Sequence, residues 1–397
     1  MTDMTESTFQ SKLPHLGTSI FTEMSILAHK HQAINLSQGF PEFDTPDFLK
    51  EGIQQAIREG KNQYAPSPGI PDLLTQIGEL VQRCYIRDEA RRLDPMKNIA
   101  VTTGATEALW VAFQTLIRPG DEVIVFDPAY DAYEPDIQLA GGVCRHITMA
   151  APDYAIDWQQ VRAAINDKTC AIVINSPHNP TGTLLSQSDL ETLQDIVLKH
   201  GLYVISDEVY EHMTFDGQRH ESVLRYPDLF ERSFVISSFG KSFHCTGWKL
   251  GYCVAPEYLM TEFKKIHQYV TFSSFTPAQH AIAAMLENHP EHIEALSGFY
   301  QHKRDLLVDA LQGSRLKVLP SHGTYFLGVD YSAVLELNDL AFCHWLTKEI
   351  GVAAIPLSPF YQADSLDDYH KNNKVVRLCF AKHDETLLKA AEVLCGL

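Results

Sequence analysis

The sequence predicts an α/β protein, with a three-layer large domain built on a mostly parallel sheet and a smaller α+β domain. Between residues 98 and 270, short apolar runs alternate with helical stretches, a pattern typical of a parallel sheet with helices on both faces. The chain has 397 residues, 45% of them hydrophobic. Because single cores stop growing at about 250 to 300 residues, we expect two domains. The large domain is predicted over residues 46–280, and an N-terminal arm and small domain over residues 1–45 and 281–397.

Composition and charge exclude several classes of partner. The 50 acidic residues outnumber the 32 basic ones, with no block rich in lysine or arginine, so we expect no nucleic-acid or anionic-membrane surface. The 8 cysteines are scattered without a C-x-x-C pair, which argues against a metal site or a disulfide scaffold. No run approaches the roughly 18 apolar residues that a membrane-spanning helix needs. We therefore expect a cytoplasmic protein without membrane association.

The first 85 residues are expected to hold helices separated by segments that contain glycine and proline. Thr45 is expected to cap a helix over residues 46–59, with Pro46 in the first helical position. The other expected elements are an amphipathic stretch over 20–28, an extended segment over 34–41, a loop over 62–69 and a helix over 71–85.

The large domain is expected to contain seven strands that alternate with helices. The expected strands cover residues 99–103, 122–126, 143–148, 170–175, 203–206, 234–237 and 250–254, and helices cover 106–117, 188–200 and 256–269. In open sheets of this kind, ligands bind beyond the carboxyl ends of the strands. We therefore expect the chemistry in the loops that follow the strands.

After residue 277 the pattern changes to a long helical stretch followed by mixed elements. The helical stretch over 277–311 is expected to break at His289–Pro290. The remaining expected elements are strands over 316–319, 324–329, 352–355 and 375–380, with helices over 340–350 and 384–394. Such interleaving predicts a small α+β domain.

Lys241 follows the apolar run 234–236 and is flanked by small and hydroxylated residues. This is an unfavourable place for a solvated charge. The lysine is therefore either paired, or a nucleophilic amine with a lowered pKa that can form a Schiff base with a carbonyl compound. Taken alone, the position also suits a structural lysine at a strand end.

Two turns that follow expected strands offer binding groups. Gly104-Ala105-Thr106 opens a helix, where backbone N–H groups would cradle a phosphate, although an ordinary tight turn uses glycine in the same way. Asn179 lies between two prolines, which hold its backbone stiffly and let its amide bind a ligand oxygen. A plain Asx-Pro turn is the alternative.

Four further residues have both a chemical and a structural interpretation. Asp207 ends a strand, where it would pair with a cationic ring nitrogen or cap a helix, and Tyr210 would bond a ring hydroxyl. Tyr130 would stack on a planar ligand or lie in the core. Arg377 is embedded in an apolar strand, so it requires either a ligand carboxylate or an internal acid as its partner.

Taken together, these groups are the set that pyridoxal 5′-phosphate and an amino acid substrate require. They comprise a phosphate cradle, a rigid asparagine, an acid for a pyridine nitrogen, a phenol, an amine nucleophile with Ser238 and Lys249 nearby, and a carboxylate-binding arginine. The sequence contains no G-x-x-x-x-G-K-[ST], no G-x-G-x-x-G after the first strand, no H-E-x-x-H and no G-x-S-x-G. No competing cofactor accounts for the whole set.

The sequence resembles the fold-type I pyridoxal phosphate aminotransferases, class I/II, in the branch of kynurenine/glutamine transaminases and bacterial methionine aminotransferases. The resemblance covers nearly the whole chain. It is carried by LSQGFP (36–41), NQYAP (62–66), TGATEA (103–108), NSPHNPTG (175–182), SDEVY (206–210), SFGKSF (238–243), TGWK (246–249) and RLCF (377–380).

The resemblance implies a role for each candidate residue. Lys241 would hold the cofactor aldehyde as a Schiff base and then act as the acid and base, while Asp207 would keep the pyridine nitrogen protonated. Tyr64 would reach the phosphate of the neighbouring subunit, which implies a homodimer with shared active sites. The implied cofactor-binding residues are Tyr64, Gly104, Ala105, Thr106, Tyr130, Asn179, Asp207, Tyr210, Ser238, Lys241 and Lys249; the implied substrate-binding residues are Gly39, Asn179 and Arg377.

The implied activity is transfer of the amino group of methionine, or another uncharged or aromatic L-amino acid, to a 2-oxo acid. No second arginine is evident for a dicarboxylate side chain, and the pocket is expected to be lined by Ile20, Phe21, Tyr130 and the partner's Phe272. The alternatives are a kynurenine/glutamine transaminase or a cysteine-conjugate β-lyase, which uses the same residues but expels a sulfur leaving group. A catalytically silent regulator of the same fold is a further alternative.

Overall fold

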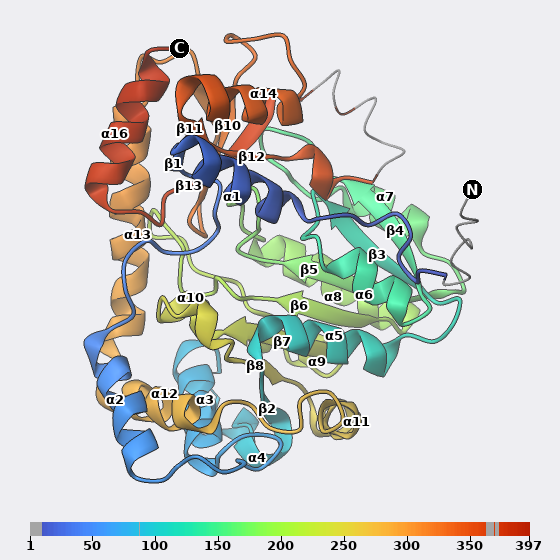
Figure 1. Ribbon diagram of the computed structural model, residues 1–397. Coiled ribbons are helices and arrows are strands. Elements are labelled where there is room, and N and C mark those ends of the chain that lie inside the picture. The colour runs from blue at the N-terminus through green and yellow to red at the C-terminus, as the bar shows by residue number, and fades with distance from the viewer. Residues whose placement is uncertain (1–9, 87, 363–368, 370–372) are drawn as a thin grey trace, which may run out of the picture.

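The structure, a computed structural model, describes residues 10–86, 88–362, 369 and 373–397. Its centre is a seven-stranded sheet with the order β2-β8-β7-β6-β5-β3-β4 (Figure 1). Strands β3 to β7 run parallel, and β8 runs antiparallel to both β2 and β7. The strands are β2 (Ile99–Thr102), β3 (Glu122–Asp127), β4 (Val143–Thr148), β5 (Thr169–Asn175), β6 (Tyr203–Asp207), β7 (Ser233–Ser238) and β8 (Gly251–Val254). The predicted mostly parallel sheet is confirmed.

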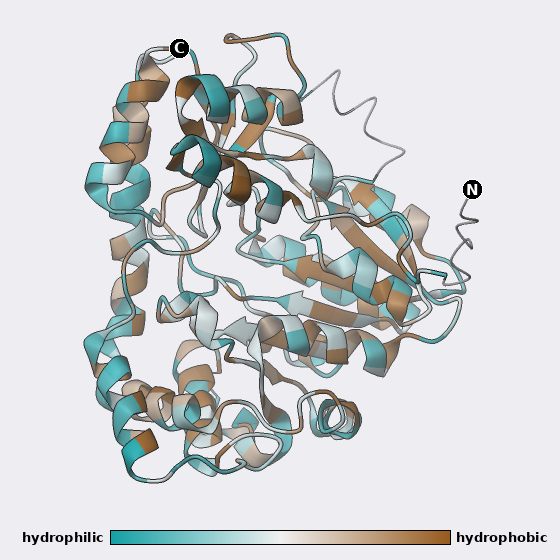
Figure 2. Ribbon diagram, viewed as in Figure 1, coloured by the Kyte–Doolittle hydropathy of each residue, from teal (hydrophilic) through white to brown (hydrophobic). Residues whose placement is uncertain are grey.

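Helices cover both faces of this sheet, in agreement with the apolar stretches within its strands, brown in Figure 2. Val125 and Ile205 belong to one buried cluster with residues of α5 (Gly104–Leu116), α6 (Tyr133–Leu139) and α11 (Glu257–His267). Their neighbours Ile124 and Val204 belong to a second cluster with residues of α8 (Gln187–His200). Successive residues of a strand thus enter different cores, as the two-residue period of a strand requires.

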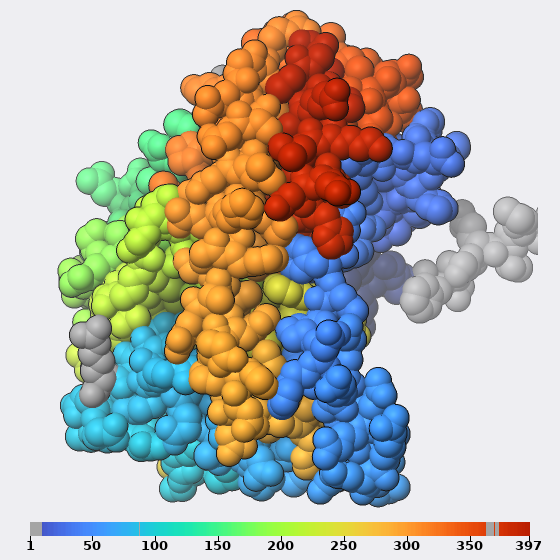
Figure 3. All heavy atoms as spheres, turned by 90° about the vertical axis from the view of Figure 1, so that its left-hand side faces the viewer, coloured from blue at the N-terminus to red at the C-terminus, as the bar shows by residue number. Residues whose placement is uncertain are grey.

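A second, antiparallel sheet has the order β12-β13-β10-β9. Its strands are β9 (Lys317–Val318), β10 (Phe326–Asp330), β12 (Ile355–Pro356) and β13 (Val375–Cys379). The N-terminal arm joins this region because β1 (Ile34–Asn35), after α1 (Ile20–His31), pairs in parallel with β11 (Val352–Ala353). Two helices, α13 (Glu291–Ala310) and α16 (Asp384–Cys395), lie side by side along it, as the orange and red atoms of Figure 3 show.

Further helices complete the described part of the chain. Helices α2 (Asp47–Arg58), α3 (Pro71–Cys84) and α12 (Thr276–Asn288) form one group (Figure 1). The other helices are α4 (Pro95–Asn98), α7 (Trp158–Ala164), α9 (Pro227–Phe230), α10 (Phe239–Ser242), α14 (Asp339–Trp345), η1 (Glu89–Arg91), η2 (Val223–Arg225), η3 (Thr246–Trp248), η4 (Leu346–Ile350) and η5 (Ser358–Phe360). Within the described ranges, no helix combines the length and apolar character needed to cross a membrane.

Several local predictions can be compared with these elements. The break at His289–Pro290 is confirmed, because α12 ends at Asn288 and α13 begins at Glu291. The predicted cap at Thr45 is wrong: Pro46 precedes α2 without a side-chain cap, and the Thr45 hydroxyl donates instead to the carbonyl of Phe243 at 2.7 Å. The division into residues 46–280 and the two flanking segments stays a prediction.

Candidate active site

The carboxyl ends of β5, β6 and β7 open on one cavity of about 300 Å³. The sheet places Asn175, Asp207 and Ser238 at these ends, as expected for ligand sites in open α/β sheets. The segment that follows β1 and the strands of the second sheet close the opposite side. Of the residues predicted from the sequence, those lining the cavity are Gly39, Gly104, Ala105, Thr106, Tyr130, Asn179, Asp207, Tyr210, Ser238, Lys241, Lys249 and Arg377.

Lys241 lies in α10, immediately after β7, and its amine points into this cavity. Its Nζ donates hydrogen bonds to the Tyr325 hydroxyl at 2.9 Å and to the Gly39 carbonyl at 3.4 Å. No ion pair joins Lys241 to any carboxylate of the described residues. Burial lowers the pKa of Lys241 to about 8. Near neutral pH the neutral form, which a nucleophile or base requires, is therefore far more populated than in an ordinary lysine.

Asp207 occupies the end of β6 and is buried. Its Oδ2 accepts a hydrogen bond from the Tyr133 hydroxyl at 2.7 Å, and its Oδ1 accepts one from the backbone N–H of Val209 at 3.3 Å. Burial raises the pKa of Asp207 to about 6, although the hydrogen bond from Tyr133 opposes this effect. The alternative role as a helix cap is wrong, because a turn and not a helix follows β6.

An anion cradle lies at the N-terminus of α5. Gly104 has a φ of +74°, and a Cβ added there would lie 3.3 Å from Nζ of Lys249. At Gly251, a Cβ would lie 2.8 Å from the backbone nitrogen of Ala105, so only glycine leaves that N–H accessible. Lys249 Nζ donates to Oγ1 of Thr106 at 3.3 Å. Backbone N–H groups, a hydroxyl and a cation at a helix N-terminus together suit a phosphate.

Arg377 reaches the cavity from β13 and is only 1% exposed. Its Nη1 donates to Oδ1 of Asn179 at 2.8 Å and its Nη2 to the carbonyl of Ser37 at 3.1 Å, while its guanidinium lies 3.9 Å from the centre of the Phe326 ring. Its buried Nε has no hydrogen-bond partner among the described residues. The alternative of an internal acid partner is wrong for the described residues, because no ion pair of Arg377 is formed among them. A buried cation without an anion is costly unless a ligand supplies the charge.

The Asn179 loop is held by a chain of hydrogen bonds. The side-chain oxygen of Asn175 accepts from the backbone N–H of Asn179 at 2.8 Å, and the Asn175 amide donates to the carbonyl of Asp207 at 2.8 Å. Asn179 is thereby linked both to Arg377 and to the end of β6. The predicted rigid placement of Asn179 is consistent with this chain of contacts.

Tyr64 is the one predicted site residue that does not line the cavity. Its side chain is 81% exposed and contacts the ring of Phe272, which is about half exposed, edge-on with ring centres 5.1 Å apart. Phe272 does not line the cavity either, and among the expected pocket residues Phe21 does, whereas Ile20 lies in the core. The predicted contacts of Tyr64 and Phe272 involve a neighbouring subunit and so stay predictions.

Sequence reasoning missed two tyrosines that contact the central side chains. Tyr133 donates to Asp207, and its place only three residues after Tyr130 was the available signal. Tyr325 accepts from Lys241, but no motif pointed to it. Among the described residues, no group of three His, Cys, Asp or Glu side chains is arranged to hold a metal ion.

Comparison with known proteins agrees with this geometry. Residues 31–394 match the family described as aminotransferase class I and II. The chain belongs to this family. It is 52% identical to a methionine aminotransferase of Escherichia coli over 97% of each chain, and 37% identical to a kynurenine–oxoglutarate transaminase of Dictyostelium discoideum over 96% of this chain and 94% of the relative. The predicted family and enzyme class are thus confirmed.

Solved structures of other aminotransferases share the whole fold. The structure of Escherichia coli YbdL, reported to have a methionine aminotransferase function, superposes with a TM-score of 0.94 at 52% identity, covering 98% of this chain and 99% of that one. N-succinyldiaminopimelate aminotransferase from Mycobacterium tuberculosis superposes with a TM-score of 0.92 at 37% identity, covering 98% and 100%. The fold predicted from the sequence is confirmed.

Proposed function

We propose that this aminotransferase uses pyridoxal 5′-phosphate to move the amino group of methionine, or another uncharged or aromatic L-amino acid, to a 2-oxo acid. The observation that supports this most directly is that two cations, the partly buried Lys241 and the buried Arg377, share one cavity and form no ion pair with any described residue. Lys241 has the lowered pKa of a reactive amine, and Arg377 has an unsatisfied Nε. The Lys241 amine can attack a carbonyl carbon, and the Arg377 guanidinium can bind a carboxylate.

The residues around the cavity fit the cofactor. The N-terminus of α5, Ser238 and Lys249 would hold its phosphate, because they present N–H groups, a hydroxyl and a cation around the space left by Gly104. Tyr130 would form the wall against its ring, with Asn179 and Tyr210 at the ring hydroxyl. When bound, pyridoxal phosphate supplies an electron sink that makes the α-proton of an amino acid acidic.

Asp207 and Lys241 would carry the proton chemistry. With a pKa of about 6, Asp207 is mostly ionised above neutral pH, so its carboxylate would bind a protonated ring nitrogen and keep the proton there. The neutral Nζ of Lys241 would take the proton from the substrate Cα and would then donate it to the carbon that carries the cofactor's aldehyde. One amine thus acts first as a base and then as an acid.

The substrate would be held by its carboxylate and selected by its side chain. A Cβ at Gly39 would lie 3.1 Å from the Phe326 ring and 3.7 Å from Nη2 of Arg377, so glycine keeps this approach open. Among the described residues, the cationic side chains lining the cavity are Lys241, Lys249 and Arg377, each with another role. The rest of the lining near the substrate is largely apolar and aromatic, including Phe21, Phe40 and Leu109. This composition favours methionine and aromatic side chains over aspartate.

A panel of amino acids and 2-oxo acids tests the proposal. The purified enzyme, loaded with pyridoxal phosphate, should produce the 2-oxo acid of methionine without free ammonia when an acceptor is present. Ammonia and a thiol from a cysteine conjugate would instead indicate the β-lyase alternative, and preference for kynurenine would indicate the other transaminase activity of the family. No reaction with any donor, or no change of cofactor absorbance on addition of methionine, would overturn the proposal.

Arg377→Lys should lower kcat/KM for methionine by about 10- to 100-fold, because lysine keeps the charge but loses two-pronged binding of the carboxylate. The loss should fall mainly on KM. With 3-(methylthio)propylamine, which lacks the α-carboxylate, the variant and the wild type should react at similar rates. A loss of equal size with both donors would show that Arg377 does not bind the carboxylate.

We further propose a homodimer with shared sites, in which Tyr64 binds the phosphate held by the other subunit. Tyr64→Phe should weaken cofactor binding about tenfold through loss of one charge-assisted hydrogen bond, measured by titration of the apoenzyme. Tyr258→Phe is the matched control, because Tyr258 is 50% exposed, its hydroxyl donates to the backbone carbonyl of Glu231, and neither residue lines the cavity.

Mixing subunits separates this role from a local one. A hybrid of Tyr64→Phe and Lys241→Ala subunits contains one site with both Lys241 and a partner's Tyr64. That site should bind the cofactor with wild-type affinity if the sites are shared. If that site keeps the weak cofactor binding of Tyr64→Phe, the shared-site proposal is wrong.

The cytoplasmic location expected from the sequence stays a prediction.

A further inference from the structure

The Tyr325 hydroxyl, the Lys241 amine and the Gly39 carbonyl form a triangle of hydrogen bonds. The hydroxyl accepts from Nζ of Lys241 at 2.9 Å and donates to the carbonyl of Gly39 at 2.7 Å. Nζ also approaches the Gly39 carbonyl at 3.4 Å. Tyr325 is not among the residues that line the cavity, and it is fully buried, so it holds the amine from behind the cavity wall.

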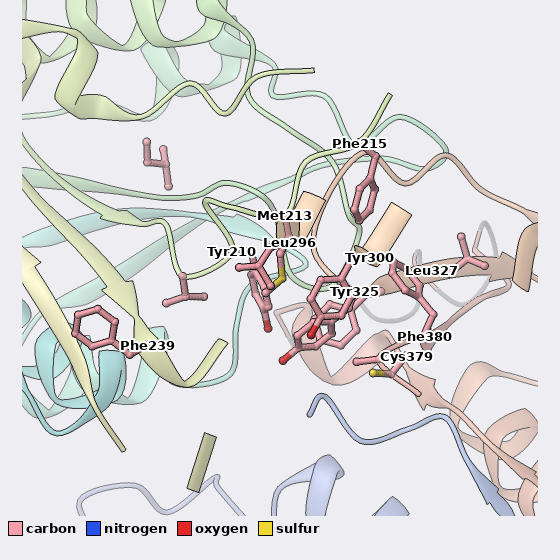
Figure 4. Packing of buried hydrophobic residues seen from close by; sticks show 14 of the residues in the cluster. Tyr210, Met213, Phe215, Phe239, Leu296, Tyr300, Tyr325, Leu327, Cys379 and Phe380 are labelled. Carbon is pink, nitrogen blue, oxygen red and sulfur yellow. The ribbon is translucent and has the colours of Figure 1, made fainter. Parts of the chain in front are cut away.

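The Tyr325 ring is fixed by the aromatic side chains around it, as Figure 4 shows. Tyr210 meets it edge-on with ring centres 5.2 Å apart, Phe326 lies at 4.8 Å, and Tyr300 lies at 5.6 Å. Close packing on several sides restricts the ring to one orientation. The position of the Tyr325 hydroxyl is therefore fixed, and the Lys241 side chain loses much of its conformational freedom when its amine binds this hydroxyl.

The direction of these hydrogen bonds decides what the amine can do. A neutral phenol has one hydrogen, and that of Tyr325 is directed to the Gly39 carbonyl. Toward Lys241 the hydroxyl can therefore only accept, so the amine must donate. The lone pair of the neutral amine is not used in this contact and remains free for a carbonyl carbon or a proton.

The same hydroxyl connects the amine to the expected carboxylate site. Gly39 lies beside Arg377 and Phe326, and Tyr325 directly precedes Phe326 in the chain. A substrate carboxylate bound beside Gly39 and Arg377 would thus lie at a fixed distance and direction from the Lys241 amine. We infer that Tyr325 is a positioning residue, which holds the Lys241 amine whenever it is not covalently engaged and aligns it with the substrate bound at Gly39.

This inference rests on the proposed function, but its first test does not need turnover. In the apoprotein, labelling of Lys241 by acetic anhydride at different pH values, followed by mass spectrometry of its peptide, gives the pH midpoint of the amine. Tyr325→Phe keeps the ring and removes the acceptor of the ammonium form. Its midpoint should fall by about half to one pH unit. The other groups acting on this amine, Asp207, Lys249, Arg377 and Cys379, are unchanged in the variant.

Tyr300→Phe is the matched control. Tyr300 packs against Tyr325, is equally buried, and has a hydroxyl with no hydrogen-bond partner. Its removal should leave the labelling midpoint unchanged. In the holoenzyme, Tyr325→Phe should lower kcat for methionine about tenfold with little change in KM, whereas Tyr300→Phe should not.

Three outcomes would overturn the inference: a midpoint of Tyr325→Phe equal to that of the wild type, an equal shift in Tyr300→Phe, or no effect on kcat. If Tyr325→Phe fails to fold, 3-fluorotyrosine at position 325 keeps the ring and hydroxyl but weakens the acceptor, and a smaller fall of the midpoint is expected. An unshifted midpoint there would also overturn it. Wild-type protein that labels as expected but never transaminates would contradict the proposed function alone.

Discussion

Lys241→Ala is expected to lower transamination of methionine by at least about 10⁴-fold, because one substitution removes both the covalent attachment and the acid–base group. The structure leaves no obvious substitute. The neighbouring Lys249 is directed to Thr106 at the anion cradle, and Arg377 is bound to Asn179. Single-turnover and steady-state assays of the purified variant measure the loss. Near-normal turnover would remove Lys241 from the mechanism.

A chemical readout accompanies the rate. Borohydride treatment of the loaded wild type should attach the cofactor to the peptide that contains Lys241, and no peptide of Lys241→Ala should carry it. Lys249→Met is the comparison variant within the same cavity. It should require more cofactor for saturation, because a cation at the cradle is lost, yet it should keep the covalent attachment. Equal loss of attachment in both variants would mean that the two lysines cannot be assigned separate roles.

The parts of the site that could be predicted from the sequence are those fixed by strand topology. Once alternating strands and helices indicated a parallel sheet, residues directly after the strands had to meet at one edge. Asp207 and Ser238, far apart in sequence, accordingly line the same cavity. Arg377 required a different argument: an arginine in an apolar strand needs a partner, and the structure leaves its Nε without one.

Contacts that depend on side-chain direction between distant segments could not be predicted. Tyr325 reaches Lys241 across 84 residues of sequence, and nothing in its local pattern distinguishes it from other core tyrosines. The Thr45 prediction was wrong for a related reason. A threonine before a helix is a good local cap, but a carbonyl 198 residues away competes for its hydroxyl. The role proposed for Tyr64 requires a second subunit, so it is tested by the subunit-mixing experiment.

Asp207→Asn is expected to lower kcat/KM by about 10²- to 10³-fold, the scale of losing one well-placed electrostatic group, or about 3 to 4 kcal/mol of transition-state stabilisation. Asparagine has nearly the same shape, so the packing around β6 should persist. The negative charge is lost, so the protonated ring nitrogen of the cofactor would no longer be stabilised by a carboxylate. The hydrogen bond from Tyr133 can still be accepted by the amide oxygen.

Two comparisons isolate the charge of Asp207 from its structural contacts. Tyr133→Phe removes the hydrogen bond to Oδ2 but leaves the carboxylate, so its loss in kcat/KM should be smaller, about tenfold. Loading Asp207→Asn with the N-methyl analogue of the cofactor, whose ring nitrogen is cationic without a proton, should restore part of the rate. Without such recovery, or with a loss below about tenfold in Asp207→Asn, the carboxylate would not be the group that keeps the ring cationic. Because burial raises the pKa of Asp207 to about 6, the rate at which the wild-type apoenzyme binds the cofactor should show an inflection near pH 6, where the carboxyl becomes protonated and loses its charge. This inflection adds to the fall that protonation of Lys241 causes below its own pKa of about 8. Asp207→Asn should keep the fall caused by Lys241 and lose the inflection near pH 6, which assigns that inflection to the Asp207 side chain.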